Sequence, residues 1–278
     1  MNKNKKIETL EDFARIIHVL LKSDRDVVLG VGGMTGEGKS TFLTLLQKKY
    51  SEISNSYWNF DRMTWNRKEL LKWIDGEGEE KEGQLPEYSA ILVDELFSMF
   101  FKRNWYDEGQ IDAIATLNMC RDRHLFIGGN IPDFWSLDSS FLERVRFYVY
   151  IAERGRAWVF QQENNPFSND KWNRNDSRKL FRKKRNPYRL PNFVCEIKFN
   201  DWDKEEKEEY LKIRNSKRVF AIKDNKKEKV ERYSKIKSQR DILLRALMKS
   251  DPNLTQKGVS DLIEMDKSSI SYILAGVR

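Results

Sequence analysis

Residues 30–41, with the sequence GVGGMTGEGKST, constrain the fold of this chain more than any other stretch. They contain the pattern Gly-x4-Gly-Lys-Ser, which starts at Gly33 and places its lysine at Lys39. The stretch DVVL at 26–29 predicts a short buried strand before the pattern, and the apolar positions at 42–46 predict a helix after it. A strand, a glycine turn and a helix N-terminus form a site for anions, because backbone N–H groups and the helix dipole both favour negative charge there.

The same pattern is that of a P-loop, which holds the phosphates of a nucleotide. Lys39 is expected to reach the β- and γ-phosphates, and the hydroxyl of Ser40 is expected to ligate Mg²⁺. The implied ligands are therefore ATP and Mg²⁺. The residues expected to line the phosphates are Gly33, Met34, Thr35, Gly36, Glu37, Gly38, Lys39, Ser40 and Thr41.

A second apolar run, AILV at 90–93, is followed directly by Asp94 and Glu95. It predicts a buried parallel strand that delivers two carboxylates to the edge of the sheet where the P-loop also emerges. The run resembles the Walker B element of P-loop ATPases. That resemblance implies that Asp94 holds Mg²⁺ through its coordination shell and that Glu95 polarises the attacking water. The expected fold is an α/β P-loop NTPase with a mostly parallel sheet flanked by helices.

Two further strands are expected, a short one at 56–60 and a buried one at 125–130 that ends on Asn130. In P-loop ATPases with a catalytic glutamate, the strand between the P-loop strand and the Walker B strand ends in a polar residue that senses the γ-phosphate. Asn130 matches that role by position. The alternative is an ordinary turn residue before Ile-Pro.

The passage from 128 to 151 is similar to the sensor-to-arginine-finger segment of AAA+ ATPases, and the run from 94 to 151 also resembles the FtsK–HerA group of DNA-pumping ATPases. That group includes phage proteins similar to zonula occludens toxin. In such ring ATPases an arginine before a strand reaches the nucleotide of the next subunit, which implies a homo-oligomeric ring. Arg144 and Arg146 are the candidates, and Arg144 is preferred because Arg146 is expected to pair with an acid of its own subunit. The strand beginning at 145 is expected to form a hairpin with 157–162 at the edge of the sheet.

The net charge of +8 is concentrated in one stretch of the 278 residues. Residues 171–190 contain nine Lys or Arg and one Asp, interleaved with Trp172, Phe181 and Tyr188. Basic side chains with aromatic residues between them favour contact with a nucleic-acid backbone, although a solvated charged face is the simpler alternative. The candidate DNA contacts are Arg178, Arg182, Lys183, Lys184 and Arg185.

Residues 239–278 resemble the helix-turn-helix of phage repressors and transposases. A helix is expected at 241–249, a second one capped by Thr255, and a third beginning at Lys267, with Glu264 at a turn that usually takes glycine. Val259, Met265, Ile270 and Ile273 or Leu274 are expected to fill a small core. The residues expected to face DNA are Lys267, Ser268, Ser269, Ser271 and Tyr272. A protein-binding three-helix bundle is the alternative.

The expected organisation is an ATPase domain at 1–165, a basic extension with charged helices at 166–238, and a helix-turn-helix domain at 239–278. Two cysteines without metal-like spacing, no signal peptide and no run of about 18 apolar residues predict a cytoplasmic protein that does not span a membrane. The sequence therefore predicts an ATP-driven DNA motor for translocation or genome packaging, of a virus or mobile element. The alternatives are an AAA+-like replication initiator or helicase loader, and a DNA-bound regulator or partition protein that uses ATP as a switch.

Overall fold

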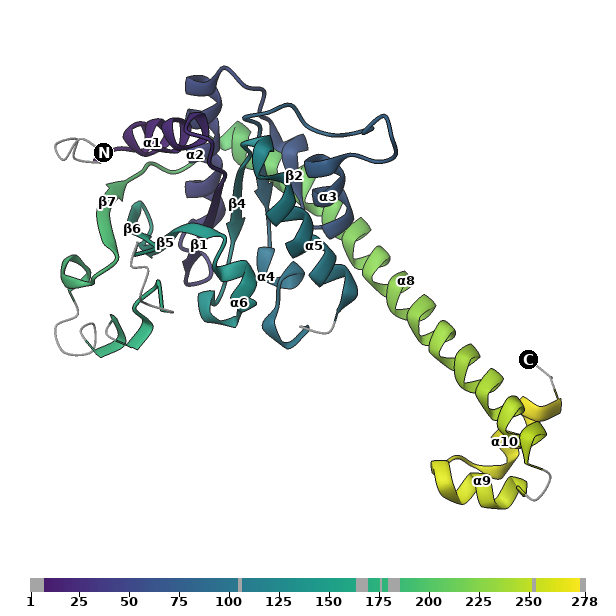
Figure 1. Ribbon diagram of the computed structural model, residues 1–278. Coiled ribbons are helices and arrows are strands. Elements are labelled where there is room, and N and C mark those ends of the chain that lie inside the picture. The colour runs from purple at the N-terminus through teal and green to yellow at the C-terminus, as the bar shows by residue number, and fades with distance from the viewer. Residues whose placement is uncertain are drawn as a thin grey trace. The chain divides into compact units, whose positions relative to one another are not determined.

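The computed structural model describes residues 8–104, 107–163, 170–175, 177–179, 186–251 and 254–275 (Figure 1). The chain forms two compact units, Met1–Lys217 and Arg218–Arg278. This division differs from the expected boundaries near 165 and 238. The reason is that a strand and the start of a long helix, both from the expected basic extension, pack into the first unit.

A seven-stranded sheet in the order β2-β3-β4-β1-β5-β6-β7 forms the centre of the first unit. The pairs from β2 to β5 are parallel, and β6 and β7 continue the sheet in antiparallel pairing. This confirms the expected α/β fold with a mostly parallel sheet, and β4 lies between β1 and β3 as expected. The strands are β1 (Val27–Gly33), β2 (Met63–Thr64), β3 (Ala90–Val93), β4 (Phe126–Asn130), β5 (Val145–Glu153), β6 (Arg156–Gln161) and β7 (Phe193–Lys198).

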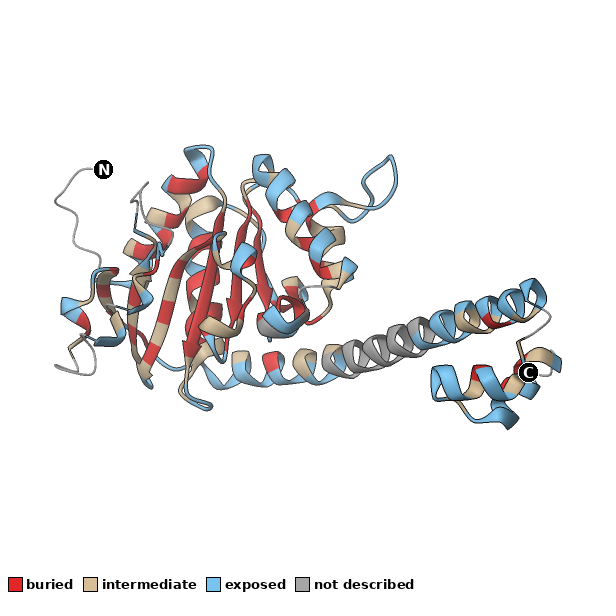
Figure 2. Cartoon of the chain, turned by 60° about the horizontal axis from the view of Figure 1, so that its bottom comes forward, coloured by how far each residue is buried: buried red, intermediate tan, exposed pale blue. Residues whose placement is uncertain are grey.

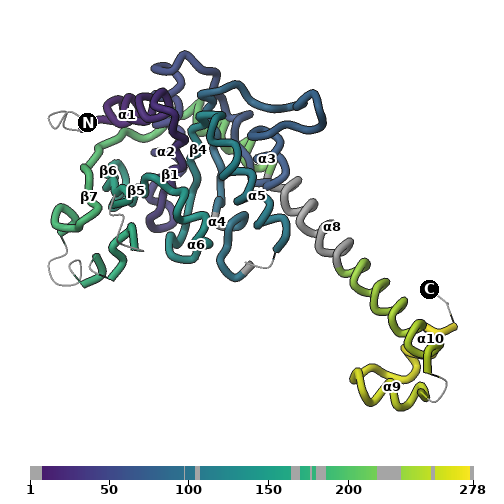
Figure 3. Tube along the Cα trace, in the orientation of Figure 1, coloured from purple at the N-terminus to yellow at the C-terminus, as the bar shows by residue number. Residues whose placement is uncertain are grey.

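Helices cover both faces of this sheet, and the tube in Figure 3 allows the chain to be followed through them. In the first unit they are α1 (Leu10–Lys22), α2 (Lys39–Ser54), α3 (Arg67–Asp75), α4 (Leu96–Met99), α5 (Glu108–Met119) and α6 (Ser139–Leu142). Short 3₁₀ helices are η1 (Phe60–Arg62), η2 (Lys102–Asn104), η3 (Cys120–Arg123), η4 (Phe134–Ser136) and η5 (Pro187–Arg189). The long helix α8 spans Lys204–Ser250.

Alternating residues of the strands face two separate layers of helices. Phe126 of β4 packs against Tyr50 of α2, and Phe147 of β5 packs against Phe13 of α1. On the other face, Ile91 and Ile127 belong to a cluster built from α3, α4, α5 and α6. The strands β1, β3 and β4 are therefore buried along almost their whole length (Figure 2), as parallel strands covered on both faces should be.

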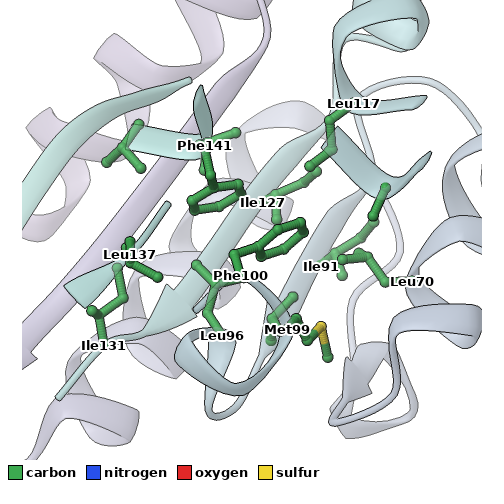
Figure 4. Close-up of a cluster of buried hydrophobic side chains, with 14 of the residues drawn as sticks. Leu70, Ile91, Leu96, Met99, Phe100, Leu117, Ile127, Ile131, Leu137 and Phe141 are labelled. Carbon is green, nitrogen blue, oxygen red and sulfur yellow. The ribbon is translucent and has the colours of Figure 1, made fainter. Parts of the chain in front are cut away.

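The second of these layers holds a stacked aromatic pair that joins α6 to the chain after α4. The rings of Phe100 and Phe141 lie 4.1 Å apart at an angle of 11°, surrounded by Leu96, Ile131 and Leu137 (Figure 4). All five side chains are buried. This packing fixes the backbone that leaves the carboxyl ends of β3 and β4, where polar residues follow.

Three expected elements differ from the structure. The second strand is Met63–Thr64 and not 56–60, where an Asn59-capped 3₁₀ helix begins instead. The hairpin β5–β6 is not the edge of the sheet, because β7 pairs with β6. The charged helical part of the expected extension and the helix expected at 241–249 form the single helix α8, since no glycine or proline interrupts Lys204–Ser250.

The second unit contains the last part of α8 with α9 (Gln256–Ile263) and α10 (Lys267–Ala275). Its core consists of Leu244, Val259, Ile270 and Ile273, with Met265 and Leu274 partly buried against it. The expected core residues are thus confirmed. Thr255 caps α9 by accepting a hydrogen bond from the Gly258 amide, and Glu264 adopts the left-handed conformation with φ 52° at the turn. No helix among the described residues is long and apolar enough to cross a membrane.

Candidate functional site

The glycine pattern forms the connection between β1 and α2, as expected from the sequence. The backbone turns at Gly36 (φ 89°) and Gly38 (φ 93°), conformations that side chains with a Cβ atom rarely adopt. Helix α2 then begins at Lys39, so its first N–H groups face the turn. Of the expected phosphate-lining residues, Met34 is 71% exposed and Thr35 and Gly36 are also exposed, while Thr41 is buried.

The ammonium group of Lys39 folds back onto this turn. Its Nζ atom donates hydrogen bonds to the backbone oxygens of Gly33 at 3.0 Å and Met34 at 2.9 Å. Burial lowers the pKa of Lys39, and the negative charges of Asp94 and Glu37 partly oppose this shift. The only lysine of the motif is therefore held at the mouth of the turn and lies near the carboxylate of β3.

The carboxyl ends of β1, β3 and β4 bring three polar side chains together. The Nδ2 atom of Asn130 donates to Asp94 Oδ1 at 2.6 Å and to Ser40 Oγ at 2.9 Å. Asp94 is 4% exposed and Asn130 is 5% exposed. Residues separated by as many as 90 positions in the sequence thus share one amide group at the start of α2.

These side chains fit a single small cation of the Mg²⁺ type. The Ser40 hydroxyl and the Asp94 carboxylate both lie within hydrogen-bond distance of the same nitrogen atom, so one ion could contact both oxygens. Among the described residues there is no group of three or more His, Cys, Asp or Glu side chains placed to hold a metal. Mg²⁺ commonly takes one or two protein carboxylates together with phosphate oxygens and water, so Asp94 and the Ser40 hydroxyl are the protein oxygens here that could hold it.

Glu95 follows Asp94 at the same edge of the sheet and is exposed. It caps α4 in the left-handed conformation with φ 62°, and its backbone oxygen accepts hydrogen bonds from the amide and hydroxyl of Ser98. A residue other than glycine in this conformation carries backbone strain of about 1–3 kcal/mol, which is commonly found at functional sites. Glu95 is therefore an exposed residue that directly follows the buried Asp94 in the sequence.

Sequence reasoning missed two residues of this site, Tyr210 and Arg214 on α8. The Tyr210 hydroxyl donates to Asp94 Oδ2 at 3.3 Å, and Arg214 Nε lies 3.7 Å from the same oxygen. Burial, followed by the negative charge of Asp94, raises the pKa of Tyr210 to about 12. The sequence contains a pattern that could have indicated them. Glu206, Tyr210, Arg214 and Lys217 follow one another at spacings of three or four residues, which places them on one face of a helix.

The two arginines expected to reach a neighbouring subunit lie at the opposite edge of the sheet. Arg144 pairs with Asp26 and donates to the Leu117 backbone oxygen at 2.9 Å, and its side chain is 9% exposed. The reason given for preferring Arg144 does not hold, because Arg144 is the one that pairs with an acid of its own chain. Which of the two arginines reaches a neighbouring subunit stays a prediction. Arg146 is half-buried beside it, and burial lowers its pKa.

The expected DNA contacts are described in part. Arg178 is exposed, whereas Arg182, Lys183, Lys184 and Arg185 lie outside the described residues. On α10 the five expected residues are all exposed, and Tyr272 is 65% exposed: Lys267, Ser268, Ser269, Ser271 and Tyr272. These residues lie on the same helix as Ile270 and Ile273, which belong to the core of the second unit. The polar face of α10 is therefore open for contact with a ligand.

The sequence matches no family model and no curated protein. Solved structures match part of the chain at low identity and with TM-scores below 0.5. For PCH-2 from C. elegans the identity is 13% and the TM-score 0.35, with 52% of this chain and 42% of that chain covered. For the N-terminal domain of zonular occludens toxin from Neisseria meningitidis the identity is 14% and the TM-score 0.36, with 66% of this chain and 98% of that chain covered. For the genome packaging NTPase B204 of Sulfolobus turreted icosahedral virus 2, solved with ATP-gammaS, the identity is 11% and the TM-score 0.30, with 50% of this chain and 92% of that chain covered. The chain thus spans less than half the length of PCH-2.

Proposed function

We propose that this protein is an ATP-hydrolysing DNA motor, for translocation or genome packaging, whose second unit binds DNA. The observation that carries the nucleotide part is the shared Asn130 amide between Ser40 and Asp94 at the start of α2. Three parallel strands deliver these groups to the edge where a glycine turn opens into a helix N-terminus. That arrangement suits the phosphates of a nucleotide together with one divalent cation.

The proposed roles follow from position and charge. Lys39 exchanges its two backbone oxygens for the β- and γ-phosphate oxygens, and the phosphates take their remaining hydrogen bonds from the backbone of residues 33–41. Ser40 and Asp94 would hold Mg²⁺, which would neutralise charge on the phosphates. Glu95 accepts the proton of the attacking water from the solvent side, and Asn130 links the bound phosphate to the Asp94 carboxylate. Phosphoryl transfer depends mainly on such positioning and charge stabilisation.

The DNA part of the proposal rests on the second unit and on the basic stretch 171–190. The exposed polar face of α10 carries a lysine, three serines and a tyrosine, which can contact phosphates and base edges. The basic stretch would add contacts that do not depend on sequence. Assembly of several copies, such as a ring, would let consecutive subunits act on the same DNA. Light scattering in saturating ATP and DNA measures that assembly.

The deciding experiment is ATP turnover measured alone, with nonspecific duplex DNA and with single-stranded DNA. A motor is expected to show turnover that DNA stimulates several-fold whatever its sequence. Little stimulation combined with one preferred DNA sequence would instead identify an ATP-switched regulator or partition protein. Loading of a helicase onto DNA in the same assay would identify an initiator or loader.

Two variants make the assay specific to this site. Lys39→Ala removes the phosphate-facing ammonium and should lower turnover by about 10³-fold. Lys49→Ala is its matched control, because this lysine lies on the same helix, is exposed and pairs only with nearby Glu52 among the described residues. Wild-type turnover in Lys39→Ala would overturn the nucleotide site itself.

A further inference from the structure

The first turns of α8 close one side of the candidate nucleotide site, although they begin more than 160 residues after the P-loop. Just before the helix, Trp202 Nε1 donates to the Thr41 backbone oxygen at 3.3 Å, next to Ser40. Within it, Glu206 forms an ion pair with Lys48 of α2. Two contacts therefore hold this segment on the helix that starts at the P-loop.

A third contact fixes α8 one turn beyond the site. Lys217 Nζ donates to the backbone oxygens of Asp61 at 2.9 Å and Met63 at 2.6 Å, and lies 3.3 Å from Glu69 Oε1. The same ammonium stands 5.2 Å from the centre of the Trp73 ring. Because α8 is anchored both before and after residues 210 and 214, these two side chains are presented from a fixed backbone.

Aromatic packing also holds Tyr210 in place. Its ring lies 4.5 Å from that of Trp202 and 5.9 Å from that of Phe60, and the residue is 4% exposed. The guanidinium carbon of Arg214 lies 5.9 Å from the centre of the Tyr210 ring. The Tyr210 ring thus contacts Trp202, Phe60 and the Arg214 guanidinium, and its hydroxyl donates to Asp94.

Arg214 carries a buried donor at the site, its Nε atom, that makes no hydrogen bond to the described residues. Asp94 Oδ2, at 3.7 Å, is too distant for a hydrogen bond and already accepts one from Tyr210. A buried N–H group of a cation without an acceptor is costly, so an anion entering this space would be stabilised.

We propose that Arg214 binds the terminal phosphate of a nucleotide held by its own chain, with Tyr210 as the residue that positions it. The assignment rests on the proposed nucleotide site. Ser40 and Asp94 would hold the divalent cation, which would neutralise charge on the phosphates. Because Arg214 Nε lies 3.7 Å from Asp94 Oδ2, its guanidinium stands beside the same carboxylate and would add a second positive charge for the phosphate oxygens there. Arg214 then supplies the charge expected of Arg144 and Arg146, but within one subunit.

The test compares binding of ATP and ADP, each with Mg²⁺, to the full-length chain. Arg214→Ala is expected to bind ATP about 10-fold more weakly and to leave ADP affinity within two-fold, because only ATP carries the terminal phosphate. Turnover should fall by about 10²-fold or more, since the same cation stabilises charge on the transferring group. Arg214→Lys, which keeps the charge without the planar fork, should recover part of the ATP affinity. Lys212→Ala removes one exposed charge from the same helix and should behave as wild type.

The preference for ATP over ADP tests the role of Tyr210, because a purely structural role would not change this preference. Tyr210→Phe keeps the ring beside the guanidinium and should retain the preference for ATP over ADP. Tyr210→Ala removes the ring, so the preference should fall toward that of Arg214→Ala while ADP still binds. Retained ADP binding also shows that each variant is folded. An unchanged ATP preference in Tyr210→Ala would overturn the positioning role.

Mixing experiments decide whether Arg214 acts within its own chain. Arg214→Ala subunits combined with Lys39→Ala subunits should stay inactive, because each site then lacks one group. Recovered turnover would overturn action within one chain. A wild-type chain that binds neither nucleotide would overturn the proposed function and this assignment with it. Wild-type binding with an unchanged ATP preference in Arg214→Ala would overturn the Arg214 assignment alone.

Discussion

The two edges of the parallel strands each hold an aspartate beside an arginine, and the pairs differ in what they leave available. At the amino edge, before β1 and β5, Arg144 donates to Asp26 and to a backbone oxygen, and its side chain is 9% exposed. At the carboxyl edge, Arg214 lies 3.7 Å from Asp94 and its own side chain is 35% exposed. The first arginine is largely enclosed and has two acceptors, whereas the second has a charge nearby but no hydrogen bond among the described residues.

The difference shows that residue types alone do not distinguish a structural ion pair from a functional one. A buried pair contributes little net stability, yet removing one partner is costly because the other charge remains without compensation. A partly buried cation without a hydrogen-bond partner lowers the stability of the free protein, and a bound anionic ligand can offset this cost. Substitutions at the carboxyl edge should therefore lower activity and leave stability nearly unchanged, and those at the amino edge should do the reverse.

The largest effect is expected from Lys39→Ala at the carboxyl edge. Turnover should fall by about 10³-fold, since an aligned cation at the transferring phosphoryl group is lost. The midpoint of denaturant unfolding should change little, because within the described part of the chain the ammonium donates hydrogen bonds only to two backbone oxygens of its own loop. Steady-state ATPase rates and urea titrations measure the two quantities. A strongly destabilised protein would break the comparison, as it would make this lysine part of the structural framework.

Glu95→Gln should lower turnover by about 10²-fold while ATP remains bound, because the amide cannot accept the proton of water. Gln has the same shape, so the left-handed backbone at this position should be kept. Single-turnover kinetics with labelled ATP measure both binding and hydrolysis. Glu87→Gln, at an exposed residue, is the control. Intact turnover would show that Glu95 has no role in activating water.

Arg144→Ala tests the amino edge. It should lower the free energy of unfolding by roughly 3 kcal/mol, because Asp26 keeps its charge without its partner. Turnover per folded molecule should stay within about two-fold of wild type. Chemical denaturation with ATPase measurements checks both, and Asp26→Asn combined with Arg144→Ala should recover part of the stability. A stable variant that loses turnover, and regains it when mixed with Lys39→Ala subunits, would instead make Arg144 act on a neighbouring subunit.

The smallest effect is expected in the second unit. Its candidate DNA-binding residues are exposed, whereas Asp94 and Asn130 of the nucleotide site are buried. Lys267→Ala together with Tyr272→Ala should weaken DNA binding by about 10-fold, and loss of one phosphate contact should reduce the salt dependence of affinity by about one unit. Basal ATP turnover should not change. Fluorescence anisotropy at several salt concentrations measures this, with Lys235→Ala as the control for one exposed charge. Unchanged affinity would move the DNA contact to residues 171–190.

Much of the site followed from the sequence because its elements are local. The P-loop is a single turn between β1 and α2, and the apolar run before Asp94 places that carboxylate at the end of a buried strand. The position of Asn130 between these strands followed from the expected strand order and is confirmed. The core of the second unit was predicted by helical spacing, as Val259, Ile270 and Ile273 show.

The sequence alone determined which segments form strands, turns and amphipathic helices around the P-loop, since short-range patterns carry that information. Only the tertiary structure decided which charged residues meet. Arg144 finds Asp26 across 118 positions, and Tyr210 finds Asp94 across 116. In a chain with 51 Lys and Arg against 43 Asp and Glu, composition permits very many such pairs. The choice among them is made when strand pairing and helix packing bring distant backbones together, because a charge interacts strongly only with groups a few ångströms away and shielded from water.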